Sequence, residues 1–358
     1  MQREASAPSP SAPAASAPPA ALKRARPGAK LDRATARVDA GGKYPQRRDF
    51  KQRAHINPMN HQLYEYPVSP ERAGWARHFP CLLGAGRPPG APAAADVVDV
   101  GCGFGGLTVA LAGALPGSLV LGLEIRPNVT EYVRLRLEAH RRGIAPAPPA
   151  APAAPAGASG EGAPPPLPSH FNASVLRTNA MKFLPCLFAK GTLSKLFFCF
   201  ADPQFKPANH RRRIVNTQLL AEYAYALRVG GRLYVITDVP DLFNWEVAHA
   251  GAHPLFARVP QALADADPAV AAMRGATEEA HKVAREGRTG DVQWAVFERV
   301  AGGAVAEDRG AREGAWWDEP EVRYEYTPAG GQKTGGRSRE WRVVEGRLAA
   351  AEAADAAS

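Results

Sequence analysis

The sequence predicts an α/β fold in which a mostly parallel sheet is covered by helices on both faces. From Val97 onward, short apolar runs alternate with helical stretches, as in sheets built from β-α-β units. A glycine-rich turn at 101–106 follows the first run. Charged or amide side chains follow three later runs, at the edge where such sheets bind ligands. These observations predict one ligand site at the carboxyl ends of the strands.

The individual elements follow from the periodicity of the apolar residues. We predict strands at Val97–Val100, Leu119–Leu123, Ser174–Arg177, Leu196–Ala201, Arg232–Thr237 and Gln293–Arg299. We predict helices at Gly106–Leu115, Val129–Arg142 and Thr217–Leu227. Each helix would return the chain to the start of a neighbouring parallel strand.

Three segments fall outside this alternation. Residues 1–42 are Ala, Pro and Ser with interspersed Lys and Arg, and too little apolar surface to offset the entropy of ordering. Residues 143–169 are mostly Pro, Ala and Gly and are predicted to be a looped-out insertion. Residues 301–358 are rich in Gly, Ala and charge, and we predict a mostly disordered tail. One folded domain is therefore expected at 43–300.

Composition limits the classes of partner and compartment. The 44 Lys and Arg exceed the 35 Asp and Glu, which gives a net charge of +9 and favours a polyanionic partner such as RNA. Four scattered cysteines without a C-x-x-C pair predict neither disulfides nor a zinc site, and thus a reducing compartment. No apolar run approaches the roughly 18 residues of a membrane span, so we expect no membrane association.

The glycine-rich turn is the predicted cofactor site. Glycines at 101 and 103 allow the backbone to turn sharply and approach a nucleotide closely. About twenty residues later Glu124 ends the next strand, where a carboxylate can accept the hydroxyl protons of a ribose. A dehydrogenase would share such a turn, but the form Asp99-x-Gly101-x-Gly103 resembles the first motif of class I methyltransferases and favours S-adenosylmethionine. The alternative for Glu124 is an exposed carboxylate at a helix start.

Two further segments follow strands at the same edge. Asn179 and Ala180 are placed to hold an adenine edge, although an Asn there is often only a helix cap. Asp202 opens the segment Asp-Pro-Gln-Phe-Lys, which runs into the basic residues 210–213. The alternative for Asp202 is a turn-forming Asp-Pro. The basic run favours an RNA substrate, with Asp202 accepting hydrogen bonds from the Watson–Crick edge of a guanine.

Together these residues resemble the tRNA (guanine-N7-)-methyltransferases in their eukaryotic form. The resemblance covers roughly residues 44–300 apart from the insertion, and implies a Rossmann-like class I methyltransferase fold with a seven-stranded sheet. The most specific matching segments, besides the glycine turn, are Arg53–Pro58, Gly122–Arg126, Arg177–Lys182, Asp202–Lys206, Leu220–Ala224, Thr237–Val239, His253–Phe256 and Thr277–Glu279.

The resemblance implies specific roles. Asp202 would be the catalytic acid, acting as an orienting group rather than an obligatory base, because guanine N7 carries a free lone pair. Thr277, as a helix N-cap, and Glu279 would close over the methionine end of S-adenosylmethionine. The residues implied to contact this cofactor are Gly101, Gly103, Glu124, Arg126, Asn179, Ala180, Cys199, Thr277 and Glu279.

The same resemblance implies partners. The substrate would be a guanosine in the variable loop of tRNA, and a noncatalytic WD-repeat subunit would form a heterodimer with this chain. Nuclear localisation is expected from the family. The basic cluster at residues 23–26 could serve nuclear import or contact RNA, and the alternative is an ordinary solvated charge run. For RNA contact we predict Arg47, Arg53, Lys182, Lys206, Arg211 and Arg212. The alternative for Arg47 and Arg53 is a solvated face of the chain.

Two departures from the family pattern keep alternatives open. Ala201 and Gln204 stand where the family has Pro and an aromatic residue or His, and Gln204 cannot stack on a base. A scaffold that binds RNA without turnover is one alternative. A methyltransferase acting on a protein or a small amine is another, although it would favour an acidic or apolar rim rather than a basic one.

Overall fold

The structure is a computed structural model that describes residues 43–53, 56–59, 64, 66–82, 93–144, 170–302, 323–326 and 341–345. The predicted tail at 1–42, nearly all of the insertion at 143–169 and most of 301–358 lie outside the described residues. Inside 301–358 the structure describes two antiparallel strands, β8 (Arg323–Tyr326) and β9 (Trp341–Glu345).

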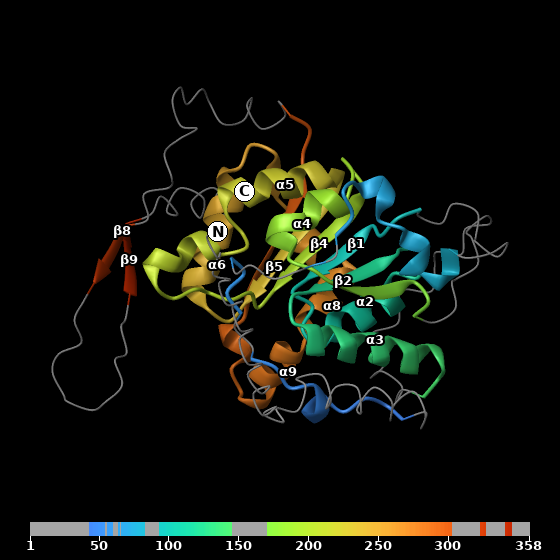
Figure 1. Ribbon diagram of the computed structural model, residues 1–358. Coiled ribbons are helices and arrows are strands. Elements are labelled where there is room, and N and C mark those ends of the chain that lie inside the picture. The colour runs from blue at the N-terminus through green and yellow to red at the C-terminus, as the bar shows by residue number, and fades with distance from the viewer. Residues whose placement is uncertain are drawn as a thin grey trace, which may run out of the picture.

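The predicted seven-stranded, mostly parallel sheet is confirmed (Figure 1). Its strand order is β3-β2-β1-β4-β5-β7-β6, and β7 runs antiparallel to both of its neighbours. The order reverses between β1 and β4, which is where open α/β sheets bind ligands. The strands are β1 (Val97–Val100), β2 (Val120–Glu124), β3 (Ala173–Arg177), β4 (Leu193–Cys199), β5 (Leu227–Thr237), β6 (Phe256–Arg258) and β7 (Gln293–Arg299).

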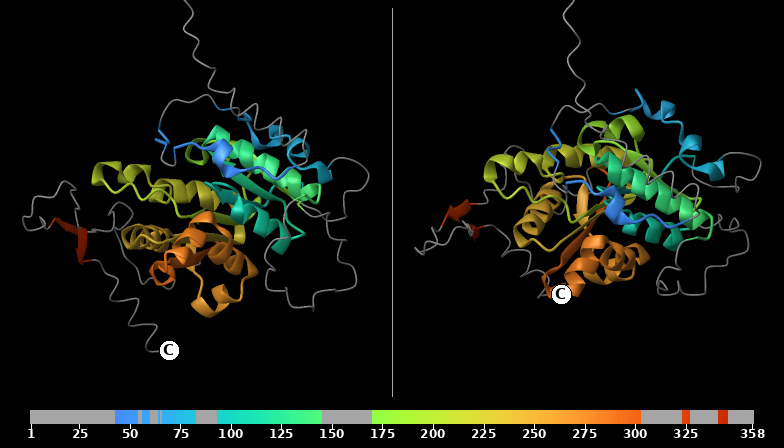
Figure 2. Two further views of the ribbon diagram at one scale, coloured as in Figure 1. Left: turned by 90° about the horizontal axis from the view of Figure 1, so that it is seen from below. Right: turned by 60° about the horizontal axis from the view of Figure 1, so that its bottom comes forward.

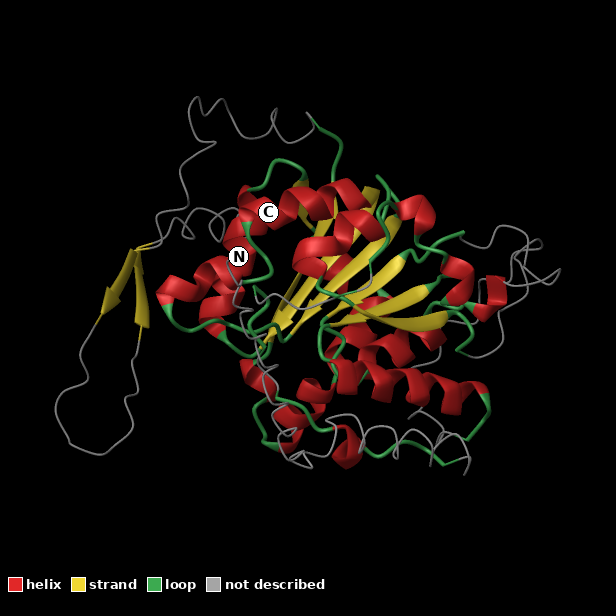
Figure 3. Ribbon diagram, viewed as in Figure 1, coloured by secondary structure: helices red, strands yellow, loops and turns green. Residues whose placement is uncertain are grey.

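Helices cover both faces of the sheet (Figure 3). One face packs against α4 (Ala180–Leu187), α5 (Thr217–Ala226) and α6 (Pro240–Ala252). The other packs against α2 (Gly106–Ala114), α3 (Pro127–Arg141), α7 (Gln261–Asp265) and α8 (Pro268–Ala276). The helix α9 (Glu278–Arg285) follows α8 directly. The short 3-10 helices are η1 (Arg47–Phe50), η2 (Pro70–Arg72), η3 (Trp75–Arg77), η4 (Pro80–Leu82), η5 (Pro207–Arg212) and η6 (Thr289–Asp291).

The alternation of side chains along the strands builds the two layers of core. In β4, Leu196 and Phe198 pack under α4 and α5, whereas Phe197 packs on the opposite face. Successive residues of a strand point to opposite faces, so a strand buried on both sides is apolar throughout. This explains why the parallel strands were recognisable as continuous apolar runs.

The fourth strand differs from its prediction. It ends at Cys199 rather than Ala201, because Phe200 adopts a left-handed φ of 51° and leaves the extended conformation. The N–H of Phe200 still donates to the carbonyl of Ile236 at 2.7 Å. The turn therefore starts two residues earlier than the apolar pattern suggests, and it aims residues 201–205 away from the strand direction.

Other elements escaped the sequence-based prediction. The edge strand β6 is only three residues long, and α4 contains Pro185, which obscures the helical pattern. The helices α6 to α9 were not assigned, apart from the cap at Thr277.

Figure 2 shows the N-terminal arm, residues 43–53, lying beside α3. Within the described residues, none of the helices combines the length and apolar character that a membrane span requires.

Candidate active site

Four of the predicted site segments meet at one edge of the sheet. Gly101 follows β1, Glu124 ends β2, Asn179 follows β3 and Asp202 follows β4. These four strands are neighbours and parallel, so their carboxyl ends lie side by side. The fold thus brings these residues to one edge of the sheet, although Gly101 and Asp202 are 101 positions apart in the sequence.

The glycine turn has open space on its outer side. Gly101 and Gly103 have φ of 73° and 55°, a region that other residues rarely adopt. A Cβ built on Gly101 would meet no atom within 4 Å, and one on Gly103 would meet only two atoms at 3.9 Å. The backbone here is therefore not shaped by packing against the protein. It leaves room for a ligand directly against the turn.

The last glycine of the turn has a different role. A Cβ on Gly106 would lie 2.2 Å from the carbonyl oxygen of Ala276, at the end of α8. The start of α2 thus contacts the junction between α8 and α9 closely enough to exclude any side chain. At this junction Thr277 caps α9, because its Oγ1 accepts a hydrogen bond from the N–H of Ala280 at 3.0 Å. The predicted cap at Thr277 is confirmed.

Glu278, which the sequence did not single out, is an acid that contacts the last glycine of the turn. Its Oε2 accepts from the Gly106 N–H at 3.3 Å, and its Oε1 accepts from Arg47 at 3.0 Å and Arg136 at 2.8 Å. The predicted residue Glu279 instead pairs with Lys282 at 3.2 Å, and its side chain is 53% exposed. Both acids occupy the first turn of α9, and only the packing of the helix decides which one faces the site.

Glu124 lies buried under the turn with its carboxylate fully occupied. Oε1 accepts from the backbone N–H groups of Ile125 and Arg126 at 2.8 and 2.9 Å and from Arg126 Nε at 3.0 Å. Oε2 accepts from the Gly103 N–H at 3.1 Å and from Arg126 Nη2 at 2.8 Å. The alternative of an exposed helix-start carboxylate is thereby excluded, since Glu124 is 3% exposed. Arg126, a predicted cofactor contact, covers this carboxylate.

Two further titratable groups lie in the neighbouring strands, the buried Asp99 in β1 and the half-buried Cys199 at the end of β4. Burial raises the pKa of Asp99 to about 7, although Thr108 donates a hydrogen bond to it at 2.8 Å. Burial also raises the pKa of the Cys199 thiol well above its usual value, so this predicted cofactor contact is a neutral thiol.

Asn179 is the N-cap of α4. Its Oδ1 accepts from the Met181 N–H at 3.1 Å, and its Nδ2 donates to the Pro58 carbonyl at 2.6 Å. The side-chain amide therefore joins α4 to the segment 56–59 of the N-terminal region. Ala180, the other predicted adenine contact, is buried at the first position of the helix.

The segment after β4 forms a tight, half-buried turn. Asp202 Oδ1 accepts from the N–H of Gln204 at 3.1 Å, and Gln204 has a left-handed φ of 49°. The two side chains that follow, Phe205 and Lys206, are exposed, with Phe205 67% exposed. A large exposed aromatic ring is suited to stacking on a planar ligand.

Most of the residues predicted to contact RNA are accessible. Arg47, Arg53, Lys182, Lys206 and Arg211 are exposed, and Arg212 is half-buried. One member of the basic run at 210–213 does not reach the rim. Arg213 is fully buried, because its guanidinium turns inward against α6 and pairs with Asp241. Spacing alone could not separate Arg213 from its exposed neighbours.

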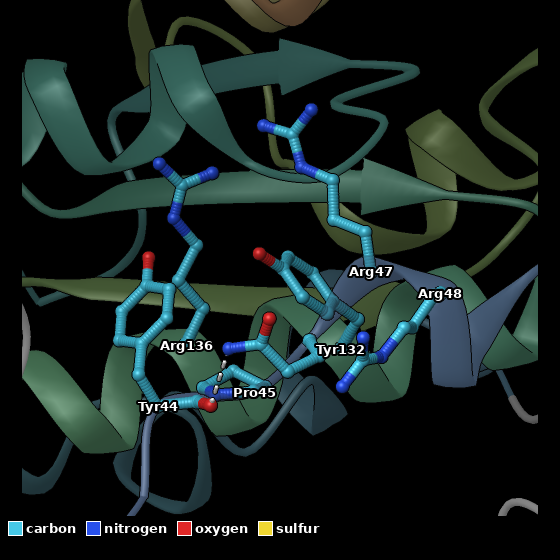
Figure 4. A pocket seen from close by; sticks show the side chains of 7 residues that line it. Tyr44, Pro45, Arg47, Arg48, Tyr132 and Arg136 are labelled. Carbon is cyan, nitrogen blue, oxygen red and sulfur yellow. Dashed lines mark hydrogen bonds between the residues drawn. The ribbon is translucent and has the colours of Figure 1, made fainter.

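Arg136 is a second residue that the sequence analysis missed. It lies on α3 and donates through Nη1 to the Phe104 carbonyl at 2.7 Å as well as to Glu278. Beside it a pocket of 410 Å³ opens between α3 and the N-terminal arm (Figure 4). The pocket is lined by Tyr44, Pro45, Gln46, Arg47, Arg48, Tyr132 and Arg136.

In the part of the chain that the structure describes, no three His, Cys, Asp or Glu side chains gather as metal ligands would.

Comparison with known proteins identifies the family. Residues 93–291 match the family model described as "Putative methyltransferase". A tRNA (guanine-N(7)-)-methyltransferase of Zea mays is 41% identical over 269 residues, which are 74% of this chain and 96% of that protein. A relative of the same name from Yarrowia lipolytica is 47% identical over 72% of this chain and 78% of its own length. Another, from Arabidopsis thaliana, is 42% identical over 72% and 92%. The chain therefore belongs to the tRNA (guanine-N(7)-)-methyltransferase family.

Proposed function

We propose that this chain transfers a methyl group from S-adenosylmethionine to N7 of a guanosine in the variable loop of tRNA. One observation carries the proposal: the Asp202 segment and the open glycine turn follow β4 and β1, which are adjacent in the sheet. A base held at Asp202 and a cofactor held at Gly101 would therefore be neighbours. The names of the relatives support tRNA as the substrate.

The residues present fit S-adenosylmethionine. The open space beside Gly101 and Gly103 accepts a ligand against the backbone, and Glu124 offers a buried carboxylate to ribose hydroxyls. Because Arg126 already donates twice to Glu124, we propose that its guanidinium turns aside when a ribose binds. Ala180, Cys199 and Thr277 remain predicted contacts, whereas Glu278 replaces Glu279 as the acid of α9 that faces the turn. When bound, S-adenosylmethionine supplies an electrophilic methyl group on a sulfonium.

The chain's own residues need only orient the base and balance charge. Guanine N7 has a free lone pair, so no proton has to leave before it attacks. Asp202 accepts hydrogen bonds from the Watson–Crick edge and offsets the positive charge that develops on the ring. Exposed Lys206 and Arg211 hold neighbouring phosphates and fix the register of the RNA.

We further propose that a separate WD-repeat protein completes the enzyme as a noncatalytic subunit and that the complex acts in the nucleus. The family resemblance supports both. The basic cluster at 23–26, which also favours nuclear entry, lies outside the described residues.

The test is methyl transfer from labelled S-adenosylmethionine to bulk tRNA, with and without the WD-repeat partner. Products are mapped by cleavage specific for N7-methylguanosine. We expect label at a variable-loop guanosine, and a large loss of it in Asp202→Ala. Arg258→Lys, at the exposed last residue of β6, is the control and should keep full activity. If the protein binds cofactor and tRNA but forms no N7-methylguanosine, even with the WD-repeat partner, the result would favour an RNA-binding scaffold without turnover. Label in protein instead of tRNA would favour an amine-directed enzyme.

A further inference from the structure

A buried arginine lies directly behind the Asp202 turn. Arg213 follows η5 and is 0% exposed, although it belongs to a run of basic residues whose other members reach the surface. A charged group is costly to remove from water unless it is closely paired and hydrogen-bonded. The buried guanidinium of Arg213 therefore depends on the groups that surround it.

The guanidinium of Arg213 has three contacts. Its Nε donates to the Pro203 carbonyl at 2.8 Å, and its Nη2 donates to Asp241 Oδ2 at 2.5 Å. Its Cζ lies 4.8 Å from the centre of the Trp245 ring, and Trp245 is itself held by a hydrogen bond from its Nε1 to the Val215 carbonyl at 2.7 Å. Asp241 and Trp245 both belong to α6, so the helix fixes the arginine from behind.

The contact to Pro203 reaches the Asp202 carboxylate through one rigid unit. The carbonyl of Pro203 and the N–H of Gln204 belong to the same planar peptide group. Arg213 donates to the carbonyl oxygen of this peptide group, and the N–H of the same group, which belongs to Gln204, donates to Asp202 Oδ1 at 3.1 Å. A peptide that accepts from a cation also becomes a better donor at its N–H. The orientation of this one peptide plane thus sets where the carboxylate points.

We infer that Arg213 is a positioning residue of the proposed methyl transfer, which acts on Asp202 through the Pro203–Gln204 peptide. The peptide needs such a clamp because Gln204 is held in a left-handed conformation that costs an ordinary residue free energy. Without the clamp the turn would relax and the carboxylate would lose its direction.

The packing around Arg213 argues against a role in stability alone. Its Nη1 and the Oε2 of Glu246 are buried without hydrogen-bond partners in the structure. Arg213 is thus a buried charge whose guanidinium is incompletely satisfied, and replacing such a charge together with its partner by apolar side chains is often neutral or stabilising. A site that served only the core would gain from such a replacement, whereas a clamp on Pro203 requires a donor in this place.

The experiment is a double-mutant cycle of Arg213→Lys and Asp202→Asn, measured by single-turnover methyl transfer at saturating cofactor and tRNA. Lysine keeps the charge but lacks the planar fork that serves Pro203 and Asp241 together. We expect Arg213→Lys to lower the rate about 10- to 100-fold without changing the dissociation constants of cofactor and tRNA. In the Asp202→Asn background it should have little further effect, because it acts through Asp202. Additive losses, or an unchanged rate, would overturn the inference.

The inference rests on the proposed function, so a second readout is independent of activity. Hydrogen exchange over residues 202–206 should accelerate in Arg213→Lys and stay unchanged in Arg258→Lys. Faster exchange in an enzyme whose wild type leaves no N7 mark would reject the proposed function and leave the clamp intact. Unchanged exchange would reject the clamp whatever the activity. If Arg213→Lys does not fold, Asp241→Asn serves as the replacement, with the same changes expected to be smaller.

Discussion

Nη2 of Arg47 lies 3.0 Å from Oε1 of Glu278, which joins two residues 231 positions apart in the sequence. The same carboxylate accepts from Arg136 on α3 and from the Gly106 N–H at the glycine turn. The N-terminal arm, the turn and α9 therefore share one acidic group. Docking of the arm and the shape of the predicted cofactor site are physically connected.

This connection predicts unequal effects for the two partners. Glu278→Gln leaves the half-buried guanidinium of Arg136 without its charged partner, so we expect a loss of about 1–3 kcal/mol in the free energy of unfolding. It should also weaken binding of S-adenosylmethionine. Arg47→Ala removes a pair whose arginine is 49% exposed, and should cost less than about 1 kcal/mol. Urea unfolding and calorimetric titration measure both, with exposed Arg48→Ala as the control. Equal losses for Glu278→Gln and Arg47→Ala would contradict the shared-acid arrangement.

Alanine substitutions at two glycines of α2 should change the stability of the protein in opposite directions. Gly106→Ala would place a Cβ against the Ala276 carbonyl, a backbone atom that cannot easily move, so α9 must shift away from the turn. We expect lower stability and weaker cofactor binding. Gly113→Ala has open space around its Cβ and should stabilise α2 by about 0.5–1 kcal/mol. Thermal melts with and without S-adenosylmethionine distinguish the two. A Gly106→Ala protein with normal cofactor affinity would show that the contact is dispensable.

The buried Glu246 should make the free energy of unfolding fall as the pH rises. Burial raises its pKa well above the usual value, so the folded state keeps the proton while the unfolded state loses it near pH 4.5. The unfolded state then binds fewer protons, and the free energy of unfolding falls with increasing pH until the folded group ionises. Glu246→Gln removes this dependence and should raise the melting temperature at pH 8 more than at pH 4. Melting curves across that range test it, and parallel curves for both proteins would refute it.

Asp267 should have the opposite effect, so that its contribution to stability is lost as the pH falls. Burial alone would raise its pKa, but hydrogen bonds from Tyr234 and Lys195 outweigh burial and lower it. Its stabilising contribution is therefore present above the unfolded pKa near 3.8 and is lost as pH falls. Asp267 also caps α8 through the Ala269 N–H at 3.0 Å.

Asp267→Asn should cost about 3–5 kcal/mol at pH 7, because Lys195 and Arg232 lose their charged partner beside the core. The difference from wild type should shrink as the pH falls toward 3, which denaturant titrations at several pH values can follow. The exposed pair Arg274 and Asp265 provides the control, since Asp265→Asn should change little. A pH-independent difference would indicate that the cap alone matters.

Much of the fold was predictable because it depends on local pattern. The apolar runs identified six of the seven strands of the main sheet, and the glycine turn indicated the edge at which we predict ligand binding. The missed strand β6 spans three residues, too few for any periodicity to show. The end of β4 was misplaced because Phe200 and Ala201 are apolar, while the left-handed φ of Phe200 is set by its neighbours.

The sequence by itself determined the layers of the fold, the glycine turn and the cap at Thr277, since these follow from backbone geometry and hydrogen bonding within a few residues. Only the tertiary structure decided that Glu278 rather than Glu279 faces the turn, and that Arg213 is buried while Arg211 is exposed. The physical reason is that neighbouring positions of a helix or loop carry the same residue type, and their roles depend on how that element rotates against distant parts of the chain.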